Sequence, residues 1–167
     1  MKMFQTSIAA AMITFATTSV FAQQAAISAQ DYVAMAASSD MFEIRSSQLA
    51  LENAQSADVK SFAQEMIAEH TQLSAELTAA AKQEQVSVPE GMMEKHATQL
   101  ETLSGASGES FDAAYMEAQL LSHQEALALH SSYAENGESE PLKASARRAV
   151  PIVEEHLQHV QGMTQGQ

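Results

Sequence analysis

The sequence predicts an all-α protein with four long helices and a shorter helix that crosses between the second and the third. Composition is the first observation behind this fold class. The chain is rich in Ala, Gln, Glu, Leu and Met, and it has only 6 Gly and 3 Pro in 167 residues. Periodicity is the second observation, because apolar residues recur three and four positions apart and no stretch alternates apolar and polar residues for long.

The first residues have the pattern of a secretory signal peptide. Residues 1–2 give a short positive start, residues 8–21 are largely apolar, and Val20-Phe21-Ala22 resembles a signal-peptidase site. The apolar run is shorter than the roughly 18 residues that a membrane-spanning helix needs. The pattern therefore favours a cleaved export signal over a membrane anchor.

We accordingly predict a signal peptide over residues 1–22, cleaved between Ala22 and Gln23, and one domain over residues 23–167. The expected location is periplasmic or secreted, with no membrane span once the signal is removed. The chain contains no cysteine, so neither a lipid anchor on cysteine nor a disulfide is available. The fold must be stabilised by helix packing.

The charge balance restricts the partners of the protein. The formal net charge is −13 at pH 7, which repels nucleic acid and anionic lipid and attracts cations. We therefore expect no nucleic-acid partner, whereas a metal ion is compatible with this charge. The sequence names no protein partner.

Capping and breaking residues set the boundaries of the long helices. Ser28 followed by Asp31 resembles a capping box, Asn136-Gly137 is typical of a helix end, and Pro141 suits the first turn of the next helix. The expected long helices span residues 28–54, 57–85, 110–135 and 140–162.

The connection between the second and third long helices is too long for a tight turn. Pro89 keeps the residue before it out of helical geometry, residues 90–103 have a helical pattern, and residues 104–108 read as a Gly- and Ser-rich loop. At about 1.5 Å per helical residue plus extended ends, this segment can run the length of a bundle. We predict a crossover helix at about residues 90–103.

Four polar residues interrupt the apolar faces of the long helices. His70, His123 and His156 occupy positions where the spacing of three and four residues calls for an apolar side chain. Glu43 lies beside Phe42, at the edge of the apolar face of the first helix. All four are near the middles of separate helices, so a bundle brings them to about one level.

Three imidazoles and one carboxylate are a donor set that suits a first-row transition metal such as Zn, Cu, Fe or Mn. Ferritin-type di-iron sites take a Glu-x-x-His pair from each of two helices, and no Glu-x-x-His occurs in this chain. A di-iron centre is therefore disfavoured, and the prediction is one ion held by Glu43, His70, His123 and His156.

The alternative is that the histidines are packing residues with hydrogen-bond partners, and that Glu43 orients them in a polar network. No catalytic residues are predicted, because the chain has no cysteine and no Gly-x-Ser-x-Gly motif. Met92, Met93 and His96 are donor types that suit Cu(I). Gap-filling methionines and a solvated histidine are the more common roles of such residues.

A set of short motifs resembles the bacterial family called domain of unknown function 4142, over about residues 28–163. One of them is Glu69-His70, where the family usually has Asp-His. The resemblance implies an exported, ferritin-like four-helix bundle, with residues 90–103 in the long crossover, and it implies no established activity. The motifs are Phe42-Glu43, Leu49-Ala50, Val59-Lys60-x-Phe62-Ala63, Met66, Glu69-His70, Leu103-Ser104-Gly105, Phe111-Asp112-x-x-Tyr115, His123 and Pro151-x-x-x-x-His156-Leu157.

Two functions are compatible with these observations. The first is an exported binding or sensing protein that holds one transition-metal ion in the bundle core. The second is a non-catalytic structural or stress-related interaction module of the cell envelope, whose histidines only pack and which holds no metal. An oxidase or peroxide-handling enzyme is disfavoured, because the paired Glu-x-x-His motifs are missing.

Overall fold

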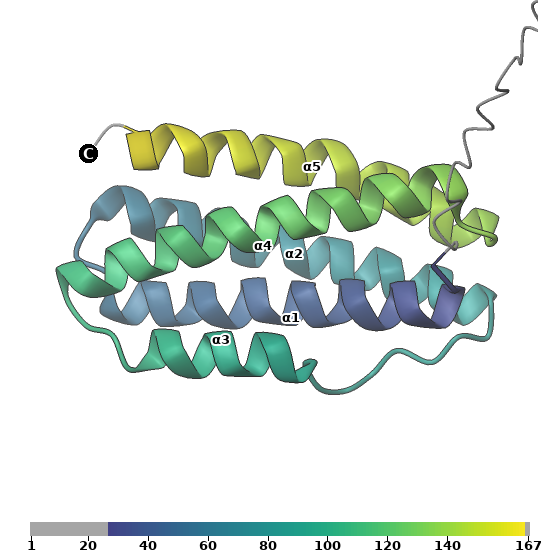
Figure 1. The fold of residues 1–167 in the computed structure, drawn as a ribbon, viewed down its shortest axis with the longest axis horizontal. Coiled ribbons are helices and arrows are strands. Elements are labelled where there is room, and N and C mark those ends of the chain that lie inside the picture. The colour runs from purple at the N-terminus through teal and green to yellow at the C-terminus, as the bar shows by residue number, and fades with distance from the viewer. Residues whose placement is uncertain (1–26, 166–167) are drawn as a thin grey trace, which may run out of the picture.

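Four long helices and one short helix make up the part of the chain that the structure describes (Figure 1). The structure is a computed structural model that describes residues 27–165, apart from the side chains of Glu109 and Gln165. The predicted signal peptide and its cleavage point lie outside these residues. The helices are α1 (Ala29–Asn53), α2 (Ala57–Gln83), α3 (Glu94–Ser104), α4 (Glu109–Asn136) and α5 (Glu140–Gln165).

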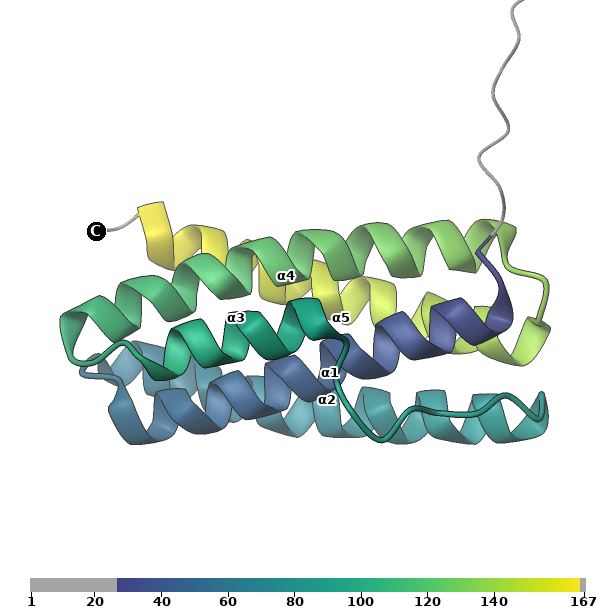
Figure 2. The ribbon, with the colours of Figure 1, turned by 60° about the horizontal axis from the view of Figure 1, so that its bottom comes forward.

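The long helices form an antiparallel four-helix bundle. α1 packs against α2 and α4, and α5 packs against α4 and α2, so that α1 and α5 lie on one diagonal. α2 and α4 run in the same direction, and the segment between them returns along the bundle with α3 lying on the outside of α1 and α4 (Figure 2). The predicted all-α bundle with a crossover helix is confirmed. None of the described helices is long and apolar enough to cross a bilayer.

The end of α2 directs the chain into the crossover. Gln85 adopts a left-handed backbone conformation with φ 57°. The N–H of Val86 then donates to the carbonyl of Ala81 at 2.9 Å, which is the bonding pattern of a Schellman motif. Val86 packs against the core at this end of the bundle, so the turn is fixed both by hydrogen bonds and by apolar burial.

The crossover helix begins later than the sequence suggested, at Glu94 and not near residue 90. Met93 caps it in an extended conformation, and its backbone N–H donates to the Ser38 hydroxyl of α1 at 2.8 Å. A contact with a distant helix therefore sets this boundary, and the local periodicity of the sequence does not predict that contact.

Apolar clusters fill the two ends of the bundle. Stacked Tyr32 and Tyr133, with ring centroids 3.9 Å apart, mark the cluster at the start of α1. Phe62, Met66 and Tyr115 belong to the cluster at the opposite end. Between these clusters the core contains polar side chains, and the predicted site lies there.

Candidate metal centre

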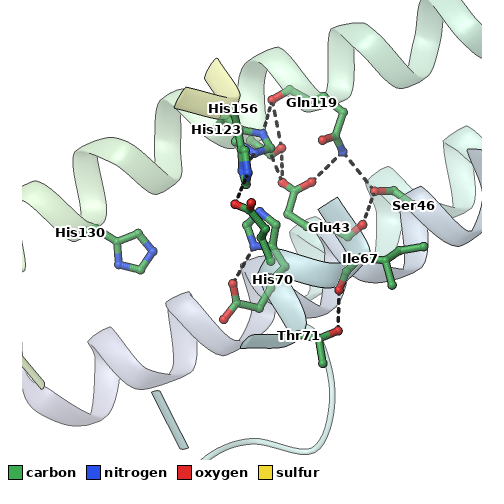
Figure 3. Close-up of polar contacts among 12 residues, drawn as sticks. Glu43, Ser46, Ile67, His70, Thr71, Gln119, His123, His130 and His156 are labelled. Atoms are coloured by element: carbon green, nitrogen blue, oxygen red, sulfur yellow. Dashed lines mark hydrogen bonds and ion pairs between the residues drawn. The ribbon is translucent and has the colours of Figure 1, made fainter. Parts of the chain in front are cut away.

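Three histidines from three helices meet in the middle of the bundle (Figure 3). His70 comes from α2, His123 from α4 and His156 from α5, and each is at most 1% exposed. The distances between ring centroids are 5.6, 5.5 and 5.3 Å, so the rings form a nearly equilateral triangle. Each ring offers a nitrogen that lies within 4.8 Å of a nitrogen of both others.

The outward-facing nitrogens of two of these rings are hydrogen-bonded to oxygen. His123 Nδ1 lies 2.8 Å from the backbone carbonyl of Gln119, which can only accept, so Nδ1 carries the hydrogen. His156 Nε2 lies 2.8 Å from Oε2 of Glu69 and donates to that carboxylate. In the neutral rings the lone pairs are therefore on His123 Nε2 and His156 Nδ1.

His70 has the same arrangement. Its Nδ1 donates to Oδ1 of Asp40 at 2.9 Å, and Asp40 is itself only 3% exposed. Its Nε2 is buried and has no hydrogen-bond partner within residues 27–165. A buried polar atom without a partner is uncommon in folded proteins, and a bound ion or water molecule is one explanation for it.

The three inward nitrogens are placed as ligands of one ion would be. His123 Nε2 and His156 Nδ1 are 3.3 Å apart. Two nitrogens bound at 2.0–2.1 Å in a tetrahedral site are separated by about 3.3–3.4 Å. Since both atoms carry lone pairs in the neutral rings, no hydrogen is available to join them, and a cation between them would satisfy both.

Protonation states favour ligand binding at two of the three rings. Burial lowers the pKa of His123, and burial followed by the nearby His70, His123 and His159 lowers the pKa of His156 to about 3. Burial also opposes charge on His70, but the hydrogen bond and the charge of Asp40 outweigh it and raise the pKa of His70. A metal would therefore displace a proton mainly from His70.

The surroundings of the rings supply negative charge. Asp40 and Glu43 are both buried, while no Lys or Arg is buried within residues 27–165. Uncompensated buried carboxylates are unfavourable. The histidines, or a cation bound by them, are the groups that can balance this charge.

Glu43 lies beside the three rings and is engaged by its neighbours. Its Oε2 accepts a hydrogen bond from Gln119 Nε2 at 2.6 Å, and its Oε1 accepts one from the Ser122 hydroxyl. Oε1 is 3.8 Å from His123 Nδ1, and that nitrogen already donates to the Gln119 carbonyl. The structure thus brings the three predicted histidines together and places Glu43 next to them without adding it to the triangle of nitrogens.

A second group of donors connects the centre with the surface. Glu65 and Glu69 of α2 and His156 each offer one ligand atom within 4.8 Å of the other two, and His156 Nε2 is the atom that contacts Glu69. The side chains of Glu65 and Glu69 are 35% and 43% exposed. His156 therefore faces the buried triangle with one nitrogen and a solvent-accessible acidic pair with the other.

Sequence reasoning missed the residues that orient the rings. Asp40 precedes Glu43 by three residues and Gln119 precedes His123 by four, so each pair shares one helix face. That spacing was a usable signal for both. Asp40 was missed because a carboxylate in the middle of a helix usually lies on the solvent side.

The fold and the site together define a class: an all-helical bundle with a buried histidine cluster at mid-height. The chain belongs to the family described as domain of unknown function (DUF4142), which matches residues 15–163. A comparison with curated proteins gives no match.

The fold is similar to that of solved structures of a copper-binding protein. The structure described as "CopM in the Cu(II)-bound form" has a TM-score of 0.70 and 19% sequence identity. The match covers 84% of this chain and 97% of the CopM chain. The structure described as "CopM in the Cu(I)-bound form" has the same TM-score and coverage, with 17% identity. At this identity the likeness shows that the two proteins share a fold.

Proposed function

We propose that the protein binds one transition-metal ion between His70 Nε2, His123 Nε2 and His156 Nδ1. The observation that carries the proposal is that the outward nitrogen of each ring donates to an oxygen, while each ring also offers a nitrogen within 4.8 Å of the other two, so that the neutral rings present three lone pairs to one ion. Hydrogen bonds from ligand histidines to carboxylates and carbonyls are the usual way in which proteins orient such rings.

The packing alternative accounts less well for this arrangement. A network of packing histidines would alternate donors and acceptors, so that each ring nitrogen has a partner. Here His70 Nε2 has none, and the contact between His123 Nε2 and His156 Nδ1 has no hydrogen in the neutral rings. A cation supplies what all three nitrogens lack.

The donor set favours one ion and copper or zinc over a di-iron pair. Imidazole nitrogen suits Zn, Cu and Fe, whereas a di-iron pair requires bridging carboxylates. Among the described residues, the group at the centre of the bundle consists of three histidines, and Glu43 keeps both oxygens in hydrogen bonds. The copper-bound state of the two similar structures supports copper as the first metal to try.

Glu43 is proposed to act through its neighbours. It holds Gln119 and Ser122, and Gln119 in turn holds His123 through its backbone carbonyl. Glu43 would have to release one of these hydrogen bonds to bind the metal directly. Its proposed role is therefore to position the part of α4 that carries His123.

Titration of the metal-free, untagged protein with Cu(II) and with Zn(II) tests the proposal. We expect one ion per chain at the centre, and a loss of that binding in His70→Gln, His123→Gln and His156→Gln. The matched control is His130→Gln, because His130 is also buried on α4 but lies apart from the three rings (Figure 3).

Equal binding by the wild type and by the three triangle variants would overturn the proposal and favour the packing module. Binding lost equally in His130→Gln would also overturn it, since the effect would then come from the fold and not from the ligands. Circular dichroism and thermal unfolding of each metal-free variant separate these cases.

A further inference from the structure

A cavity lies where the start of α3 meets α1 and α4, and none of the three histidines lines it, although Ser122, the neighbour of His123, does. It has a volume of about 70 Å³, and its lining includes Met35 of α1, Met93 at the cap of α3, His96 of α3 and Glu125 of α4. A space of this size holds an ion or a few water molecules. It therefore suits a small ligand and not an organic molecule.

His96 is held in one orientation at this cavity. Its Nδ1 lies 2.6 Å from the Ser38 hydroxyl, which also accepts the Met93 backbone N–H at 2.8 Å. The ring of Phe42 stacks on it, with centroids 5.7 Å apart and an angle of 26° between the planes. The side chain is nine-tenths buried, and its Nε2 makes no hydrogen bond with any residue that the structure describes.

The two methionines have an unusual environment for their residue type. Met35 is 39% exposed and Met93 is 47% exposed, and only Leu121 joins them among the exposed large apolar side chains of the described residues. Methionine ordinarily fills gaps in a core. Here two methionine side chains from separate elements instead line the same small cavity as a buried imidazole, and both are exposed.

The charges at the cavity do not favour a hard divalent cation. Glu125 is the carboxylate of the lining, and it is paired with Lys95. The imidazole of His96 binds a metal in its neutral form. The donors that remain are two uncharged sulfurs and one uncharged nitrogen.

We propose that Met35, Met93 and His96 form a second metal site, selective for a soft monovalent ion, namely Cu(I). Thioethers bind Cu(I) and discriminate against Zn²⁺ and Mn²⁺. The three rotatable bonds of each methionine allow both sulfurs to approach an ion beside His96 Nε2. Binding through Nε2 requires the tautomer of His96 with its hydrogen on Nδ1, which donates to Ser38 and orients the ring as an outer partner does at other metal sites.

This site is independent of the buried triangle, because it uses other residues, another face of the bundle and another donor chemistry. Ag(I) serves as a redox-inert probe for Cu(I) binding. The measurement is the NMR spectrum of the methionine methyl groups, with the Met35 and Met93 signals assigned from Met35→Leu and Met93→Leu.

We expect one equivalent of Ag(I) to shift the Met35 and Met93 methyl signals of the wild type. The same shifts should occur in His123→Gln, which lacks the buried triangle, so failure of one proposal does not imply failure of the other. Wild-type spectra that leave both signals unchanged would overturn the proposed site, whatever the triangle binds.

The affinity arm uses conservative variants. In the His123→Gln background, Met93→Leu and His96→Gln should weaken Ag(I) and Cu(I) binding by roughly 100-fold, since loss of even an outer partner costs 10–100-fold at metal sites. The matched control is Met92→Leu, because Met92 is the sequence neighbour but lines a different cavity, between α1 and α3. Equal weakening by Met92→Leu would contradict the assignment.

Discussion

His70 is the residue on which the account of the centre depends most. It lies between a buried carboxylate and two other imidazoles, and its inner nitrogen has no hydrogen-bond partner among the described residues. Asp40 fixes which nitrogen of this ring carries the hydrogen. Asp40 therefore determines whether the lone pair of His70 lies on Nε2, the nitrogen that faces the other two rings.

Asp40→Asn should weaken Cu(II) and Zn(II) binding by roughly 10–100-fold while leaving the stoichiometry at one ion. The amide can still accept a hydrogen bond from His70, but it no longer supplies negative charge beside a bound cation. Competition titration against a chelator of known affinity measures the change. Asp58→Asn is the control, because Asp58 is an exposed acid in the first turn of α2. Equal affinity in the two variants would show that Asp40 does not support the site.

A second prediction at this scale concerns acid stability. Burial, followed by the charge of His70, lowers the pKa of His130 to about 4 from an ordinary value of 6.5. The unfolded chain therefore binds more protons than the folded protein between these pH values, and the free energy of unfolding falls as the pH falls. Between pH 7.5 and 5.5 this group accounts for a loss of roughly 1 kcal/mol.

His130→Gln should remove that part of the loss, because glutamine does not titrate and can still bond the hydroxyl of Tyr32. Urea unfolding of the metal-free proteins at the two pH values gives the comparison. His156 titrates in both proteins, so the difference reports His130 together with its repulsion from His70. An identical acid loss in wild type and variant would mean that His130 is not held neutral by the fold.

At the scale of the elements, the helices differ in how well the sequence predicts the residue at which each begins. Ser28 and Ser56 cap α1 and α2 through their hydroxyls, as local motifs indicate. The start of α3 depends on Ser38, which lies 55 residues earlier in the chain, and no local pattern reports that contact.

Gly137, at the end of α4, is required by close packing. A Cβ at this position would lie 2.6 Å from Cε1 of Tyr133, and Tyr133 is buried against Tyr32 and cannot easily move. Gly137→Ala should therefore lower the free energy of unfolding by roughly 1–3 kcal/mol, the usual cost of overpacking.

Gly162→Ala is the matched control and should have the opposite sign. Gly162 lies inside α5, and a Cβ there would meet nothing within 4 Å. Replacing glycine by alanine within a helix stabilises it by roughly 0.5 kcal/mol. Chemical unfolding of both variants decides the matter, and destabilisation by Gly162→Ala or neutrality of Gly137→Ala would contradict the packing described.

The periodicity of the helices explains how much of the site could be predicted. His70, His123 and His156 could be found because each replaces an apolar residue in a regular helical pattern. Asp40 shares a helix face with Glu43 and could have been found from that spacing, whereas the burial of Ser122 depends on contacts with another helix that local periodicity does not encode. The height at which four helices align is set by loops and by packing, and only the structure gives it.

For the molecule as a whole, we propose that the protein is exported. The motivation is the short positive start, the apolar run over residues 8–21 and the Val20-Phe21-Ala22 pattern. N-terminal sequencing of the protein from fractionated cells should find Gln23 first. Protein that keeps Met1 and sediments with the membranes would contradict this proposal.

The whole molecule combines two proposed sites of different chemistry on one acidic bundle. The buried triangle offers three nitrogens among buried carboxylates, which suits a divalent transition metal. The cavity under α3 offers two sulfurs and a nitrogen, which suits Cu(I). Such a protein would hold copper in either oxidation state, each at the site whose donors prefer it.

Anomalous diffraction from crystals of the protein loaded with one equivalent of Zn(II) tests the central claim most directly. Zinc is chosen because the sulfur-containing cavity discriminates against it. We expect one strong anomalous peak at about 2.0–2.2 Å from His70 Nε2, His123 Nε2 and His156 Nδ1. Bound zinc found elsewhere, with the three rings still facing a space that holds no metal, would contradict the account.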